Sequence, residues 1–182
     1  MELTKILFFL IGTFFGVEQS RVLSEKTTIT INPEEKTIVV VQENIVSLIQ
    51  NANDSLKVYA ELKVIVQPKH QWSTEFKDYT KKEKCFFISD DGKTLNSKIN
   101  LTYKTSTDLK AFGIDINKDG ALSMIDTPKL NINSTDGKLG ERYWNFDADK
   151  PFTFTIEPLT DIPEEYKAYK KSLLPVWKTI KH

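Results

Sequence analysis

Two runs of β-branched residues separated by a turn constrain the fold of this chain most. Residues 27–31 read Thr-Thr-Ile-Thr-Ile, and residues 36–41 run from Lys through Thr and Ile to three consecutive Val. Branched side chains favour strands because they pack well on a pleated surface. Residues 32–35, Asn-Pro-Glu-Glu, have the composition of a turn. We therefore predict a β-hairpin here, which makes an antiparallel sheet the starting point of the fold.

Later segments repeat this pattern of short strands and turns. In residues 151–156, Phe152, Phe154 and Ile156 share one face, which we expect to be core. Cys85 is the only cysteine, so it forms no intramolecular disulfide, and we expect it to be a small buried side chain in a strand. Asp-Asp-Gly at residues 90–92 predicts a turn. The additional strands are predicted at residues 85–88, 98–103, 130–132, 142–146 and 151–156.

Two segments carry helix signals. Residues 55–67 alternate as a strand would, but residues 51–54, Asn-Ala-Asn-Asp, give a helix start and Pro68 a stop, so helix is favoured. Residues 163–174 begin with proline, continue with acidic residues and carry lysines late, which predicts a helix that ends near Pro175. The expected fold class is α+β, an antiparallel sheet-rich single domain with a C-terminal helix.

The N-terminus predicts export. Residues 1–20 contain a short polar segment with Lys5, an apolar run over residues 6–17 and a polar end, which is the order of a signal peptide. The apolar run of about 12 residues spans roughly 18 Å as a helix, less than the roughly 30 Å of a bilayer core. We predict a cleaved signal peptide at 1–20 and one globular domain at 21–182, secreted or periplasmic and without a stable membrane span. An uncleaved N-terminal anchor is the alternative.

Composition excludes several classes of function. Lysine plus arginine and aspartate plus glutamate both number 25, so no net positive charge attracts nucleic acid, and we expect no nucleic-acid partner. Hydrophobic residues make up 40% of the chain, which is enough for a core and argues against disorder. The only histidines are His70 and His182, so Cys/His metal clusters and histidine-dependent triads are disfavoured.

Residues 115–126 have the spacing of a calcium loop. Calcium takes six to eight oxygen ligands, which alternate oxygen-bearing residues on a tightly curled loop supply. Gly120 at position 6 allows the sharp turn, and Ala121 at position 7 offers a backbone carbonyl. Positions 1, 3, 5, 9 and 12 carry side-chain oxygens from Asp115, Asn117, Asp119, Ser123 and Asp126. We predict that these five residues and Ala121 bind one calcium ion.

This spacing resembles the EF-hand loop, and aspartate at position 12 makes it more similar to the dockerin-type variant of that loop. The resemblance covers 12 of the 182 residues. Pro128 follows where the family has an exiting helix, so a strand-loop-strand setting is expected. The resemblance implies a structural calcium ion with an affinity of roughly 10⁻⁴ to 10⁻³ M, as in extracellular modules. The alternative is a metal-free hairpin turn rich in Asn, Asp and Gly.

Two functions remain open from the sequence. The first is a non-enzymatic exported protein, stiffened by calcium, that binds a protein or carbohydrate partner, and for it we assign no catalytic residue. The alternative is a small secreted hydrolase of glycosidase type, because acids lie among the aromatics Tyr143, Trp144 and Phe146. A cleft with two acids about 5 to 10 Å apart favours the hydrolase, whereas an aromatic surface without converging acids favours binding. The candidate acids are Glu141, Asp147, Asp149 and Glu157.

Overall fold

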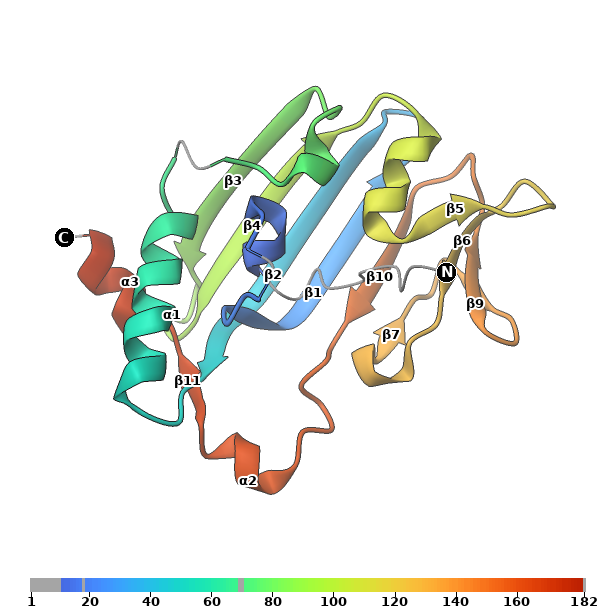
Figure 1. Cartoon of the computed structure of the whole chain (residues 1–182). Helices are drawn as coiled ribbons and strands as arrows, with labels where there is room; N and C mark the ends of the chain where they lie inside the picture. Colours follow the sequence, from blue (N-terminus) through green and yellow to red (C-terminus); the bar gives the residue numbers. More distant parts are fainter. Residues whose placement is uncertain (1–10, 18, 69–70, 182) are drawn as a thin grey trace.

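A computed structural model describes residues 11–17, 19–68 and 71–181, which form two antiparallel sheets (Figure 1). The main sheet has the order β3-β4-β2-β1-β10-β7, and β11 pairs with β2. Its strands are β1 (Leu23–Asn32), β2 (Thr37–Leu48), β3 (Lys81–Ile88), β4 (Leu95–Thr102), β7 (Ile132–Asn133), β10 (Phe152–Ile156) and β11 (Lys170–Ser172). The second sheet, in the order β5-β6-β9-β8, contains β5 (Ile114–Ile116), β6 (Leu122–Ile125), β8 (Lys138–Leu139) and β9 (Tyr143–Phe146). The predicted antiparallel, sheet-rich architecture is confirmed.

The β1–β2 hairpin forms the centre of the main sheet. Ile31 pairs with Ile38 and Ile29 with Val40, and all four side chains are buried. Thr28 alternates with Ile29 and is only partly buried, as the period of two along a strand requires. The hairpin predicted from the β-branched runs is confirmed.

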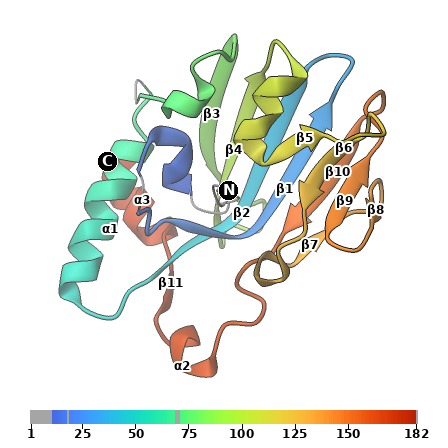
Figure 2. The same ribbon diagram turned by 45° about the vertical axis from the view of Figure 1, so that its right-hand side comes forward.

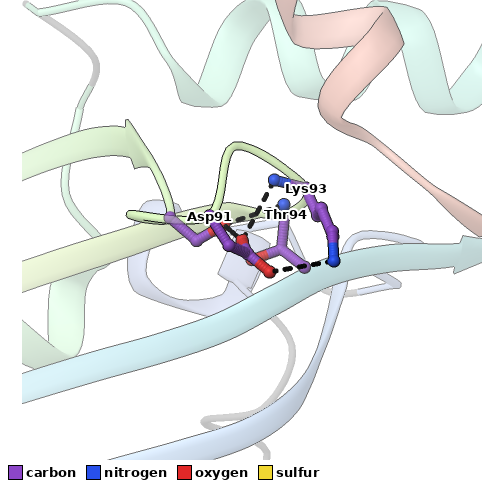
Figure 3. Close-up of polar contacts among 4 residues, drawn as sticks. Asp91, Lys93 and Thr94 are labelled. Carbon is purple, nitrogen blue, oxygen red and sulfur yellow. Dashed lines mark hydrogen bonds and ion pairs between the residues drawn. The ribbon is translucent and has the colours of Figure 1, made fainter.

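The turn between β3 and β4 is held by the side chain of Asp91 (Figure 3). Asp91 Oδ1 accepts hydrogen bonds from Ser89 Oγ at 2.6 Å and from the backbone N–H of Lys93 at 3.1 Å. The two bonds hold the pKa of Asp91 below its usual range, and the bond from Ser89 has the larger effect. Gly92 has a φ of 75°, which glycine adopts readily. The turn predicted at residues 90–92 is confirmed.

Helical segments cover one face of the main sheet (Figures 1 and 2). α1 (Ala52–Ile65) begins after Asn51, whose side chain accepts a hydrogen bond from the N–H of Asp54. Val58, Leu62 and Ile65 point into the core. The predicted helix is thus confirmed. The 3₁₀ helices η1 (Ile11–Phe15), η2 (Thr74–Phe76) and η3 (Ser106–Phe112) complete this cover, while η4 (Pro128–Leu130) precedes β7.

η1 lies deep in this cover. Phe14 is fully buried and stacks on Phe76 with 5.5 Å between ring centroids. The Phe14 carbonyl accepts a hydrogen bond of 2.8 Å from the N–H of Ser73, and Phe15 packs on Trp72. The first half of the predicted signal peptide, residues 1–10, lies outside the described residues. η1, in the second half of the predicted peptide, contributes to the core in this folded form, so a cut near residue 20 removes Ile11, Phe14 and Phe15 from that core. The signal peptide itself stays a prediction.

The predicted helix over residues 163–174 is wrong in its position. The chain forms the short α2 (Glu164–Lys167), then β11, and only then the C-terminal helix α3 (Leu174–Lys181). β11 forms because Lys171 pairs with Ser47 of β2, and the N–H of Leu173 donates to the carbonyl of Ile45 at 3.0 Å. Pro175 falls in the first turn of α3, where its missing N–H costs nothing.

Two smaller expectations also need correction. Cys85 is exposed. β3 is an edge strand in which exposed and half-buried residues alternate, and Lys84 and Phe86 on either side of Cys85 are the half-buried ones. The strand predicted at residues 130–132 is limited to β7, since Leu130 ends η4. Within the described residues, no helix combines the length and apolar composition needed to cross a bilayer.

Candidate functional site

The predicted calcium loop forms a hairpin between β5 and β6, in the expected strand-loop-strand setting. Asp115 pairs with Ser123, and Ile116 with Leu122. Asn117 Oδ1 accepts the backbone N–H groups of Asp119 at 2.9 Å and Ala121 at 3.0 Å. An asparagine that accepts from residues further along the chain in this way closes a tight turn without metal.

η3 sets the direction in which this hairpin leaves the core. Gly113 ends η3 with a φ of 67° and leads directly into β5. The Tyr79 hydroxyl donates a hydrogen bond of 2.7 Å to the carbonyl of Asp108 in η3. This bond joins η3 to the segment that follows η2. Burial raises the pKa of Tyr79 well above its ordinary value, so its phenol keeps its proton and remains a donor.

Asn145 of β9 connects the hairpin to the rest of the second sheet. It pairs with Ser123, and its Oδ1 accepts from Ser123 Oγ at 3.0 Å and from Asn117 Nδ2 at 3.1 Å. Sequence reasoning missed Asn145. The only feature of the sequence that marks Asn145 is its position as a polar residue between two aromatic residues, Trp144 and Phe146. Both aromatic side chains are buried in the structure. We call the surface that carries Asp115, Ser123, Asn145 and Tyr143 the outer face of the second sheet.

The two terminal acids of the predicted loop do not meet. Asp115 is exposed and pairs with Lys110 at 3.1 Å, and the hydrogen bond from Lys110 lowers the pKa of Asp115. Asp126 Oδ1 instead accepts from the indole N–H of Trp144 at 3.2 Å. Trp144 pairs with Met124, which is buried, so the Asp126 carboxylate is drawn towards the core side of the sheet.

The conformation described here therefore brings together only part of the predicted ligand set. Asn117 and Ser123 meet through Asn145, Asp119 lies in the turn, and the Ala121 carbonyl accepts the N–H of Asn117 at 2.9 Å. Among the described residues, no three acidic, cysteine or histidine side chains are grouped to hold a metal ion. Calcium binding at this loop stays a prediction, and it requires the Asp115 and Asp126 carboxylates to move.

The free-energy cost of that movement is small. An exposed ion pair such as Asp115–Lys110 contributes about 0 to 1 kcal/mol, and a hydrogen bond such as that of Asp126 about 1 kcal/mol. An affinity of 10⁻⁴ to 10⁻³ M corresponds to roughly 4 to 5.5 kcal/mol. The rearrangement is compatible with a weak structural site.

A depression of about 400 Å³ lies on the outer face of the second sheet. Tyr143 is 50% exposed there, beside the amides of Asn117 and Asn145. The depression thus combines an accessible aromatic ring with amide, acidic, guanidinium and hydroxyl groups. Its lining residues are Asn117, Ser123, Gly140, Glu141, Arg142, Tyr143 and Asn145.

Two of the acids proposed for a hydrolase share one hollow, and the other two lie elsewhere. Asp147 and Asp149 line a separate hollow of about 730 Å³ near the hairpin tip, Glu141 lines the depression, and Glu157 lines neither. Asp147 pairs with Lys150 at 2.7 Å, and this hydrogen bond lowers the pKa of Asp147. A glycosidase general acid needs a raised pKa and a second carboxylate across the substrate. Asp147 does not match that general acid, and the hydrolase alternative stays a prediction.

Comparisons of the chain with protein-family models, with curated protein sequences and with solved structures gave no match. The chemistry of the outer face is thus the basis for a functional proposal. An exposed phenol ring can pack against an apolar ligand surface, while neighbouring polar side chains exchange hydrogen bonds with hydroxyl groups.

Proposed function

We propose that this chain is an exported, non-enzymatic binding module, secreted or periplasmic, that binds carbohydrate on the outer face of its second sheet. The observation that carries the proposal is the half-exposed ring of Tyr143 beside Asn117 and Asn145 in one depression. Sugar rings present C–H faces that pack on aromatic rings, and hydroxyl groups that exchange hydrogen bonds with polar side chains. Both kinds of partner lie within this depression.

The polar residues of the depression form two groups. Asn117, Ser123 and Asn145 form its floor and are hydrogen-bonded to one another, whereas Glu141 and Arg142 form its rim. Asn145 is held by Asn117 and Ser123, and its own Nδ2 donates to the carbonyl of Tyr143 at 3.1 Å. These bonds leave little freedom to the floor. Glu141 and Arg142 are exposed, and no described residue forms an ion pair with either. They are the side chains we expect to contact sugar hydroxyls.

Replacing Tyr143 by alanine tests the carbohydrate proposal. We expect Tyr143→Ala to weaken binding about tenfold or more, because a lost aromatic contact and its buried area are worth at least about 1.4 kcal/mol. Tyr166→Ala is the matched control, since Tyr166 is similarly exposed on α2. The measurement is isothermal titration calorimetry with a panel of neutral hexose oligosaccharides. Absence of binding by the wild type, or equal loss in both variants, contradicts the proposal.

We further propose that one calcium ion stiffens the β5–β6 hairpin through the ligand set predicted from the sequence. The pairing of Asp115 with Ser123 and the turn closed by Asn117 support this proposal. They place three predicted ligands, Asp115, Asn117 and Ser123, close together in one hairpin. A bound ion would join the oxygens of the loop and restrict its movement. Since Asn117 and Ser123 also hold Asn145, the ion would further stabilise the floor of the depression.

Calcium is therefore expected to raise the thermal unfolding midpoint. At 10 mM calcium and the expected affinity, binding contributes about 1.4 to 2.7 kcal/mol, or roughly 3 to 10 °C for a chain of this size. An Asp115→Ala, Asp119→Ala double variant is expected to show no shift. Asp161→Ala removes an exposed acid outside the loop and is expected to behave as wild type. Differential scanning calorimetry measures the midpoints, and equal shifts in all three proteins would exclude this site.

Export is tested by N-terminal sequencing of protein recovered outside the cytoplasm. A signal peptide of residues 1–20 predicts a new N-terminus near Arg21. Recovery of Met1 would rule out cleavage and leave the uncleaved anchor. Because cleavage removes Phe14 from the core, we also expect the processed chain to unfold at lower temperature than the full chain.

A further inference from the structure

Another hollow, of about 450 Å³, is lined by residues at the end of α1, on α3 and on the edge strand β3. α1 and α3 run side by side in both views (Figures 1 and 2). The residues that determine its character are three lysines and three apolar side chains: Lys63, Lys84, Lys181, Phe86, Trp177 and Ile180. β3 and β10 lie far apart in the strand order, and the second sheet packs beside β10, so this hollow and the outer face are separate sites.

The hollow is positively charged without a counter-charge from the described residues. No acidic residue lines it. Seven ion pairs join described residues elsewhere in the chain, and none of them involves Lys63, Lys84 or Lys181. Three lysines therefore line one cavity although the whole chain has a net charge of zero.

Lys84 is the most constrained of the three lysines. Its side chain is half-buried, its ammonium group donates to the carbonyl of Ile65 at the end of α1, and it lies 4.0 Å from the ring centroid of Phe15. Burial lowers the pKa of Lys84 to about 8, because the charged form loses water. An anion placed in the hollow would favour the charged form.

The remaining lining is apolar. Trp177 is buried, and Phe86 and Ile180 are half-buried, so the hollow has an aromatic and aliphatic floor. The ammonium group of Lys181 lies 4.6 Å from the ring centroid of Trp177, so charge and apolar surface are in contact. The volume lies within the range of small-molecule sites, which are mostly apolar with a few placed polar groups.

We infer that this hollow binds a single-chain anionic amphiphile, with its carboxylate at the lysine rim and its alkyl chain against Trp177, Phe86 and Ile180. A neutral lipid leaves the three lysines without an anionic partner, and a small hydrophilic anion leaves the apolar floor in contact with water. Only a ligand with both parts matches both surfaces. This site adds a second ligand class to the proposed binding module and depends neither on Tyr143 nor on calcium.

Calorimetric titration of the full chain with monomeric decanoate tests this inference. We expect one decanoate per chain, with decanol and decyltrimethylammonium binding at least tenfold more weakly. A Lys63→Gln, Lys181→Gln double variant is expected to lose at least tenfold in affinity. A Lys57→Gln, Lys178→Gln variant changes the same number of exposed charges on the same two helices outside the hollow, and is expected to bind as wild type.

Other outcomes overturn the inference. Equal weakening in the two double variants would mean that general positive charge, not this hollow, attracts the ligand. Decanol binding as tightly as decanoate would remove the role of the lysines. Binding to vesicles of anionic phospholipid without binding of monomeric decanoate would assign these residues to a membrane surface instead. Circular dichroism of both variants confirms that they are folded, and the oligosaccharide and calcium titrations report separately on the proposed function.

Discussion

One face of the main sheet carries the apolar side chains of β1, β2, β4 and β10, and the rest of the structure depends on how that face is covered. α1 and the 3₁₀ helices provide the cover, with Phe14 stacked on Phe76 within it. Because η3 leads directly into β5, the cover also sets the direction of the hairpin. Because α1 ends beside β3 and α3, it also forms one wall of the lysine-bordered hollow. Both candidate sites therefore lie at the margins of the same packed layer.

The two sites differ in the kind of ligand that their chemistry matches. The outer face of the second sheet offers one exposed ring and a network of fixed amides, which suits a neutral ligand rich in hydroxyl groups. The hollow beside α3 offers ammonium groups over an apolar floor, which suits an anion with an alkyl chain. The zero net charge of the sequence hides this contrast, because net charge averages over positions that only folding brings together or separates.

Local signals were sufficient for the elements whose stabilising contacts are close in the sequence. The β-branched runs predicted the β1–β2 hairpin, and the polar start and Pro68 predicted α1. Non-local contacts explain the failures. β11 forms by pairing with β2, more than 120 residues earlier, so local helix propensity misplaced the C-terminal helix. Cys85 faces outwards because of where the helices lie, and Asn145 gains its role from the cross-strand partner Ser123. The hollow draws its lysines from three distant segments.

Urea unfolding of the full chain with Phe14→Ala tests whether η1 completes the cover of the main sheet. Phe14 is fully buried, so its truncation is expected to lower the free energy of unfolding by about 3 to 5 kcal/mol. Phe87, which is 38% exposed on the edge strand β3, is the matched control, and Phe87→Ala is expected to cost about 1 kcal/mol or less. Equally small losses for the two variants would show that η1 is not part of the core and does not complete the cover.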